Sequence, residues 1–265
     1  MFARLPRRSL LVALASLAFA GVASTASATH SWGGYHWART ANPFTIKLGN
    51  NVSAAWISAL NTASSDWSAS DVLNTTVVAG LANPKNCRGT AGRVEVCDST
   101  YGNNGWLGLA SISITGGTHI TQGTVKLNDT YFNTAQYNTT AWRNLVMCQE
   151  IGHTFGLDHQ DTTFGNPNLG TCMDYTSDPS TNQHPNTHDY AELDIIYAHL
   201  DSTTTISQGA ANSFAVDIDS DNPRSWGQLV KQSPGGRTAI YELDLGRGSK
   251  TVTFVIWALE ASGNR

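Results

Sequence analysis

The sequence lacks several features that would assign a function class directly. Its 16 Lys and Arg are outnumbered by 20 Asp and Glu, and the formal net charge is −4. This balance gives no support to a partner such as nucleic acid or an anionic membrane. No internal repeat is visible, and the four cysteines contain no C-x-x-C pair, which argues against a cysteine zinc site.

Long apolar runs are also missing beyond the first thirty residues. The run Leu10–Ala20 follows three arginines and precedes the small residues Ala26-Ser27-Ala28. It is only about half as long as a bilayer-spanning helix, so a signal peptide over residues 1–28 is favoured over a membrane anchor. We therefore expect a secreted chain, without a membrane partner after cleavage and with a net charge near −7 once the three arginines are lost.

Hydrophobic periodicity divides the remaining chain at about residue 202. Residues 29–202 mix helical and alternating patterns, whereas residues 203–265 are β-prone and read as a small extension. Strands are predicted at 43–48, 72–78, 93–96, 107–114, 118–127, 214–218, 238–243 and 252–257, with a hairpin turn at Gly116-Gly117. Helices are predicted after a Ser53 cap, from Thr139 or Thr140, and over 188–200.

The most informative stretch runs from Cys148 to His159 and reads C-Q-E-I-G-H-T-F-G-L-D-H. Four residues separate Gln149 from His153, which places both side chains on one helix face. Gly156 suits the left-handed turn that ends a helix, and His159 then returns toward His153. Two imidazoles with Glu150 beside them are the groups that a catalytic zinc site needs.

This stretch resembles the metzincin signature H-E-x-x-H-x-x-G-x-x-H at Glu150, His153, Gly156 and His159, with Gln149 replacing the first histidine. The segment T-C-M-D-Y, residues 171–175, is similar to the methionine turn of that family, and the helix at 188–200 resembles the last helix of matrixins. The resemblance implies an α+β fold with a twisted sheet, an active-site helix and a C-terminal helix.

The resemblance also implies a role for each site residue. Gln149, His153 and His159 would bind zinc, Glu150 would act as general base, and Tyr175 would stabilise the oxyanion. The expected activity is that of a monomeric metalloendopeptidase acting on protein or peptide substrates. In this family the substrate adds a strand to the sheet edge beside the metal, and residues 118–127 resemble that edge strand.

The replacement at Gln149 leaves three interpretations open. Its amide oxygen binds zinc as a weaker donor; or it only contacts the zinc water; or the site has lost zinc and the chain is an inactive peptide-binding or adhesion protein. In the second case the third ligand would be one of Tyr175, Asp158, Asp174, His184 and His188.

The cysteine count in a secreted chain favours two disulfides, for which three pairings exist. We predict Cys87–Cys97, closing a short loop, and Cys148–Cys172, tying the metal helix to the methionine turn. No cysteine precedes Cys87, so the sequence shows no cysteine latch of the matrixin kind.

Overall fold

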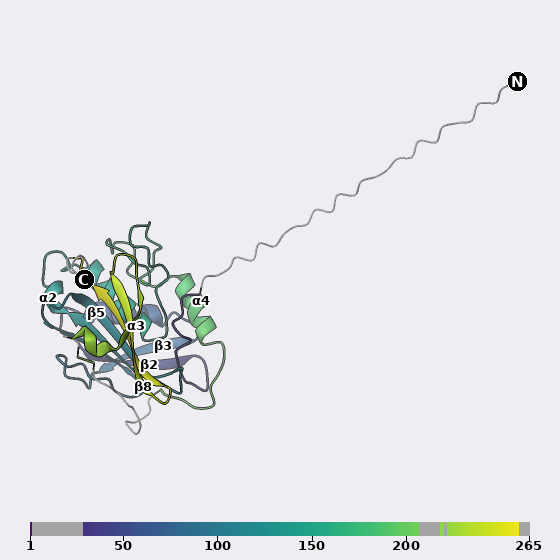
Figure 1. Ribbon diagram of the computed structural model, residues 1–265, viewed down its shortest axis with the longest axis horizontal. Coiled ribbons are helices and arrows are strands. Elements are labelled where there is room, and N and C mark those ends of the chain that lie inside the picture. Colours follow the sequence, from purple (N-terminus) through teal and green to yellow (C-terminus); the bar gives the residue numbers. More distant parts are fainter. Residues whose placement is uncertain (2–28, 207–217, 220–221, 260–265) are drawn as a thin grey trace.

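The computed structural model describes residues 29–206, 218–219 and 222–259 together with Met1. The rest of the predicted signal peptide lies outside the described residues, as do residues 214–217 of one predicted strand. The described part is an α+β structure in which one nine-stranded mixed sheet is accompanied by few helices (Figure 1).

The elements follow one another in a simple order along the chain. The first part contains β1 (His36–Trp37), β2 (Phe44–Asn51), α1 (Ile57–Trp67), β3 (Leu73–Ala79), β4 (Val94–Ser99), β5 (Trp106–Thr115), β6 (His119–Asn128), α2 (Asp129–Phe132), α3 (Thr140–His153) and α4 (Thr187–Ile196). The last part contains a 3-10 turn, η1 (Pro223–Trp226), and the strands β7 (Gln228–Gln232), β8 (Thr238–Gly246) and β9 (Ser249–Trp257).

The sheet has a parallel half and an antiparallel half. Its order is β3-β2-β4-β6-β5-β9-β8-β7, and β1 pairs in parallel with β6. The strands β3, β2, β4 and β6 run parallel, whereas β5, β9, β8 and β7 continue the sheet through antiparallel pairs. The strands of the C-terminal extension therefore lengthen the same sheet that carries the first part of the chain.

The expectation that residues 118–127 form a sheet edge is wrong. Strand β6 lies between β4 and β5, so its backbone groups are paired on both sides. The physical reason is the hairpin turn: Gly116 and Gly117 adopt φ of 59° and 87°, and after this turn β6 runs back along β5, which pairs with its other side. Strand β5 would thus be the outermost strand of the first half, and β9 pairs with it.

Of two predicted helix starts, that of α3 is confirmed and that of α1 is wrong. Helix α3 begins as predicted, because the Thr139 side chain accepts a hydrogen bond from the Trp142 N–H at 3.2 Å. The predicted Ser53 cap is wrong: α1 begins at Ile57 without a side-chain cap, and the Ser53 carbonyl instead accepts from Trp56 in a preceding turn. None of the helices in the described ranges is long and apolar enough to cross a bilayer.

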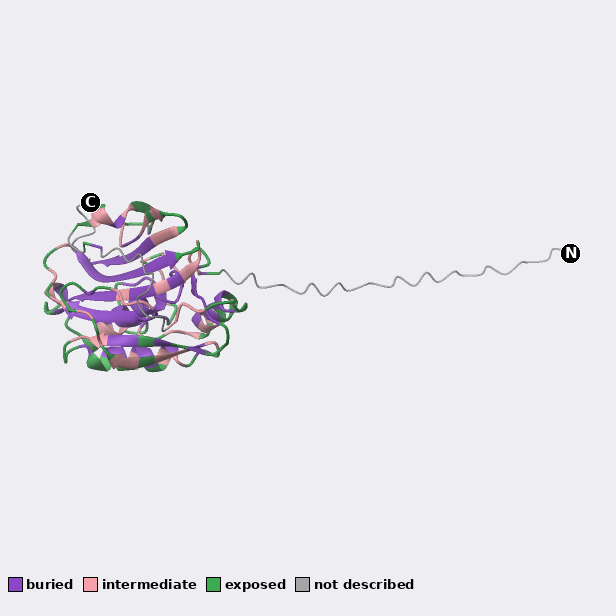
Figure 2. Cartoon of the chain, turned by 90° about the horizontal axis from the view of Figure 1, so that it is seen from below, coloured by how far each residue is buried: buried purple, intermediate pink, exposed green. Residues whose placement is uncertain are grey.

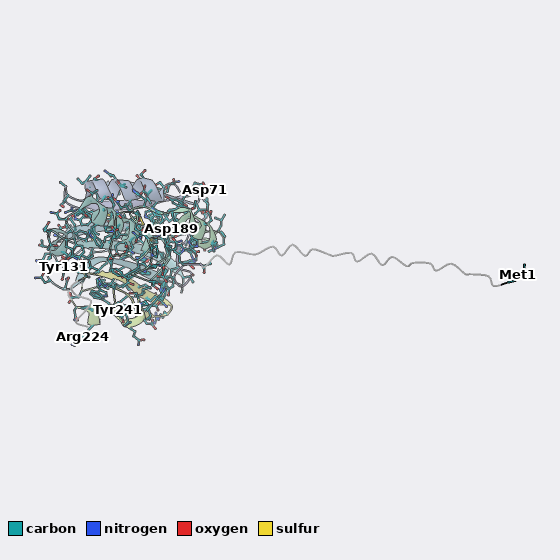
Figure 3. The ribbon with its side chains drawn as sticks, turned by 90° about the horizontal axis from the view of Figure 1, so that it is seen from above. Met1, Asp71, Tyr131, Asp189, Arg224 and Tyr241 are labelled. Atoms are coloured by element: carbon teal, nitrogen blue, oxygen red, sulfur yellow. A yellow bond between two sulfur atoms is a disulfide. The ribbon has the colours of Figure 1, made fainter. Side chains whose placement is uncertain are left out.

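The sheet is covered on both faces by apolar side chains. Helices α1 and α3 pack together, and α3 lies against β5, enclosing the main core that includes Leu107, Val146 and Phe254. A smaller core around Trp106, Trp226 and Trp257 lies on the other face. Figure 2 accordingly shows buried strands in the interior, and Figure 3 labels Asp71, after α1, and Arg224, in η1, on opposite sides of the molecule.

Candidate functional site

The last turn of α3 carries the first three residues of the predicted site. Gln149, Glu150 and His153 are each 1% exposed, because the helix is pressed between α1 and β5. Gly108 of β5 allows this close approach: a Cβ there would lie 2.6 Å from Glu150 Oε1 and 2.7 Å from Val146 Cγ1. The buried face of α3 therefore continues into the candidate site.

A glycine turn brings the second histidine back to the first. Helix α3 ends at His153, and Gly156 adopts φ of +95°. A Cβ at Gly156 would lie 2.0 Å from the Tyr35 carbonyl oxygen, so no other residue fits this turn. The chain reverses there, and the rings of His153 and His159 meet with their centroids 4.7 Å apart.

The segment 171–175 lies directly beneath the end of α3. Cys172 forms a disulfide with Cys148, as predicted, with a Cα–Cα distance of 5.9 Å; the predicted Cys87–Cys97 bridge is present as well. Met173 is fully buried, and its sulfur lies 2.7 Å from where a Cβ on Gly152 would stand. The Tyr175 ring is 5.0 Å from that of His159.

Burial shapes the protonation of these groups. Desolvation raises the pKa of the Glu150 carboxyl well above its usual range, partly offset by a hydrogen bond from the Ala110 backbone. Burial and the neighbouring His159 lower the pKa of His153 to about 3, so its imidazole is neutral, as a metal ligand requires. His153 Nδ1 lies 2.9 Å from the Leu157 carbonyl oxygen, which leaves Nε2 for another partner.

Several buried polar atoms of this site have no hydrogen-bond partner among the described residues. They are Gln149 Oε1, Gln149 Nε2, Glu150 Oε2 and His159 Nε2. Such atoms are costly to leave unpaired, and each one calls for an explanation such as an ion or a water. The two imidazoles are of the kind that binds zinc, and the Gln149 amide oxygen is a weaker, neutral donor.

Three of the other candidates for a third ligand have partners elsewhere. Asp158 accepts from the His159 backbone at 2.8 Å and from Lys231, and one oxygen of Asp174 accepts from the Leu169 backbone at 2.8 Å. His184 is half-exposed and pairs with Asp66 at 2.7 Å. His188 stacks on His30 at 4.9 Å, and its Nδ1, like Asp174 Oδ1 and the Tyr175 hydroxyl, has no hydrogen-bond partner among the described residues. Of these, Tyr175 contacts His159, with ring centroids 5.0 Å apart.

The C-terminal strands close this site, which sequence reasoning missed. Phe254 of β9 pairs with Ala110 of β5, and its ring stacks on His153 at a centroid distance of 4.3 Å and an angle of 6°. Lys231 of β7 donates to Asp158, next to His159. A strand pattern at 252–257 was visible in the sequence, but no local signal indicates β5 as its partner.

Comparison with known proteins does not identify the chain. No protein-family model matches it, and no curated protein matches it significantly. Function is therefore inferred from the geometry of residues 149–159 and 171–175 and from their resemblance to the metzincin motifs.

Proposed function

We propose that the chain is a secreted, zinc-dependent metalloendopeptidase of the metzincin type. The observation that carries this proposal is the meeting of His153 and His159, 4.7 Å between ring centroids, at a buried helix end. The unpartnered polar atoms of Gln149, Glu150 and His159 all belong to the same sequence motif. This combination is easier to explain by a bound ion than by packing.

Each residue of the site then has a chemical role. Gln149, His153 and His159 would hold the zinc ion, which when bound supplies a Lewis acid and lowers the pKa of water. Glu150 takes a proton from the attacking water and delivers it to the leaving amine. Burial raises the pKa of Tyr175 well above its usual range, so its hydroxyl stays protonated and is able to donate to the oxyanion.

The closed arrangement implies that the active form differs from the described one. In metzincins the substrate pairs with the sheet edge beside the metal, and here β9 takes up the free side of β5. Phe254 also lies over His153, where a substrate would approach. We infer that the β7–β9 strands must leave β5 before a peptide enters, which would keep the enzyme latent without a cysteine latch.

Two features of the site, Gln149 and Phe254, favour a second candidate function. Gln149 is a weaker donor than histidine, and Phe254 covers His153, as in a protein that has lost catalysis. Such a chain would be an inactive secreted peptide-binding or adhesion protein on the same fold. In such a protein, replacing Glu150 would not change any measurable activity.

The test uses protein folded in the presence of zinc. The wild type and Glu150→Ala are compared for casein or gelatin cleavage, with and without a chelator, and zinc is measured in both. The expected result is a loss of roughly 10²–10⁴-fold in cleavage with zinc retained. Asp194→Ala, an exposed carboxylate on α4, is the matched control and should leave cleavage unchanged. Cleavage that survives Glu150→Ala would contradict the proposal.

A further inference from the structure

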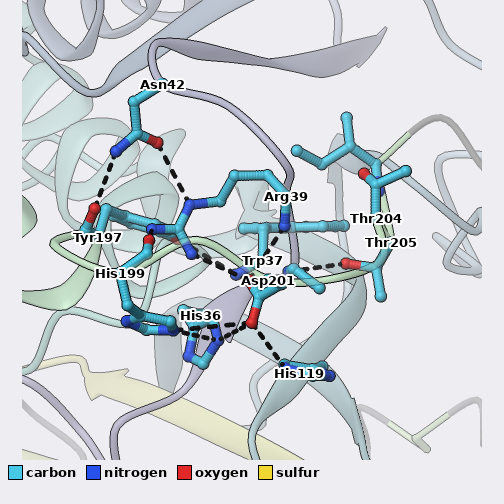
Figure 4. A network of polar contacts seen from close by, with 12 residues as sticks. His36, Trp37, Arg39, Asn42, His119, Tyr197, His199, Asp201, Thr204 and Thr205 are labelled. Carbon is cyan, nitrogen blue, oxygen red and sulfur yellow. Dashed lines mark hydrogen bonds and ion pairs between the residues drawn. The ribbon is translucent and has the colours of Figure 1, made fainter.

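A second group of metal-ligating side chains lies away from α3. Three histidines, His36, His119 and His199, surround one carboxylate oxygen, Asp201 Oδ1 (Figure 4). Their Nε2 atoms lie 3.5, 3.2 and 3.7 Å from that oxygen, respectively. Among the described residues, the group of His36, His119 and Asp201 is the one set of three His, Cys, Asp or Glu whose ligand atoms all lie within 4.8 Å of one another.

The fold brings these side chains together from three distant segments. Strand β1 pairs in parallel with β6 so that His36 stands opposite His119. The segment after α4 carries His199 and Asp201, and it is held in place by a hydrogen bond from the Asp201 N–H to the Arg39 carbonyl oxygen at 2.9 Å. The Arg39 guanidinium also donates to the His199 carbonyl oxygen. Backbone hydrogen bonds therefore fix the positions of the residues in this cluster.

The outward atoms of the cluster are already fixed by other partners. His36 Nδ1 lies 2.8 Å from the Gly34 carbonyl oxygen, so Nδ1 carries the proton and Nε2 presents a lone pair to the cluster. Asp201 Oδ2 accepts from the Arg39 guanidinium at 3.0 Å and from the Arg39 backbone at 3.1 Å. The other oxygen, Oδ1, is the one that faces the three imidazoles. His36 and Asp201 thus have the kind of support behind a ligand that is typical of metal sites.

The spacing of the cluster matches that of ligands around one ion. Three imidazole nitrogens surround Asp201 Oδ1, which is more than the roughly two donors that one carboxylate oxygen accepts. His36 Nε2 and His199 Nε2 also lie 3.1 Å apart, and only the His199 N–H can donate in that contact because His36 Nε2 carries no proton. Bonds to zinc of about 2.0–2.1 Å place neighbouring tetrahedral ligands roughly 3.3 Å apart. The contacts of Asp201 Oδ1 with His36 and His119, at 3.5 and 3.2 Å, lie around that value.

We propose that His36, His119 and Asp201 bind a zinc ion at a site separate from α3, with His199 beside the remaining coordination position. The ligand atoms of these three residues all lie within 4.8 Å of one another, and His199 Nε2 lies 3.1 Å from His36 Nε2. The ion would join β1 and β6 to the segment after α4. The inference does not depend on the proposed peptidase activity.

The test compares three proteins that are saturated with zinc and then freed of excess metal. They are the wild type, His119→Ala/His199→Ala, and the matched control His184→Ala, which removes an exposed histidine paired with Asp66. Zinc per chain is measured by mass spectrometry, and the shift in melting temperature with zinc is measured for each. We expect the double variant to hold about one zinc fewer than the wild type and the control, with a smaller thermal shift.

Equal zinc content in all three proteins would overturn the proposal. If the double variant does not fold, His119→Gln replaces it, because this ligand is 32% exposed and its loss disturbs packing less than loss of the buried His36. Competition with a chromogenic chelator should then show zinc bound at least about tenfold more weakly than in the wild type. Unchanged affinity would reject the site. Glu150→Ala, measured in parallel, should keep this zinc, so failure here and failure of the peptidase proposal give different results.

Discussion

Replacing Gln149 with leucine tests how the α3 site is built. The Gln149 side chain is 1% exposed, and neither amide atom has a hydrogen-bond partner among the described residues. An orphaned buried polar group destabilises a fold by about 1–3 kcal/mol, and an apolar side chain of similar size removes that cost. We therefore expect Gln149→Leu to stabilise the metal-free protein by about 2 kcal/mol, a rise of roughly 4–8 °C in melting temperature for a chain of this size.

Zinc should reverse the order of the two proteins. An ion that binds only the folded state stabilises it by about 2.7 kcal/mol at a concentration one hundred times its Kd. The wild type gains this increment at the α3 site, whereas Gln149→Leu loses a ligand and most of the increment. Any zinc held by the His36 cluster adds equally to both proteins and cancels in the comparison. Gln149→His should keep the full increment or enlarge it, because imidazole is the better donor.

The assay is thermal unfolding followed by circular dichroism, with zinc and with a chelator. Gln122→Leu is the control, since this buried glutamine also has an unpartnered amide oxygen but lines a different pocket with Arg88 and Thr251. It should alter stability equally in both conditions. A full zinc increment in Gln149→Leu would show that Gln149 is no ligand and would point to Tyr175. A metal-free Gln149→Leu less stable than the wild type would refute the reasoning about the unpaired amide.

Three further predictions concern a disulfide, pH and the closed state. Loss of the bridge between Cys148 and Cys172, 24 residues apart, should lower the free energy of unfolding by about 3–4 kcal/mol in denaturant titrations of a double serine variant. Burial raises the pKa of Asp129 from 3.8 to about 7, so the folded state holds this proton more tightly than the unfolded state. The stability of the fold should therefore fall as pH rises from 4 to 7, and melting curves of Asp129→Asn at several pH values should show a smaller fall. The half-exposed Lys231 pairs with Asp158, a contact that contributes up to about 1 kcal/mol to the closed arrangement of β7. Lys231→Ala should therefore raise peptide cleavage by up to about fivefold, and slower cleavage would argue against closure by β7.

The parts of the structure that the sequence predicted are those with local signals. Thr139 caps α3, the Gly116-Gly117 pair connects β5 to β6, and Gly156 turns the chain after α3 with a positive φ. The spacing of Gln149, His153 and His159 placed them together because helix periodicity and one turn decide their positions. Each of these predictions depends on interactions within about ten residues of the chain.

The parts that could not be predicted depend on partners distant in sequence. Alternation marks 118–127 and 252–257 as strands but does not say that β6 lies inside the sheet or that β9 pairs with β5. Strand β7 was missed because its residues, Gln228–Gln232, are largely exposed and lack an apolar stripe. The cluster of His36, His119 and His199 has no spacing motif, since its members are joined by a β1–β6 register and a docked segment.

The exposure of the two proposed zinc sites separates their functions. The side chains of His119 and His199 are 32% and 52% exposed, so an ion at the proposed His36 cluster would exchange with solvent without any change of fold. His153 and His159 are 1% and 6% exposed, and Phe254 stacks on His153, so under the proposed function an ion at α3 would enter or leave only when β9 separates from β5. Entry of a peptide would require the same separation, because the peptide would use the side of β5 that β9 occupies. On this proposal, metal exchange at α3 and substrate access would be two consequences of one opening of the sheet, whereas the His36 cluster would remain intact.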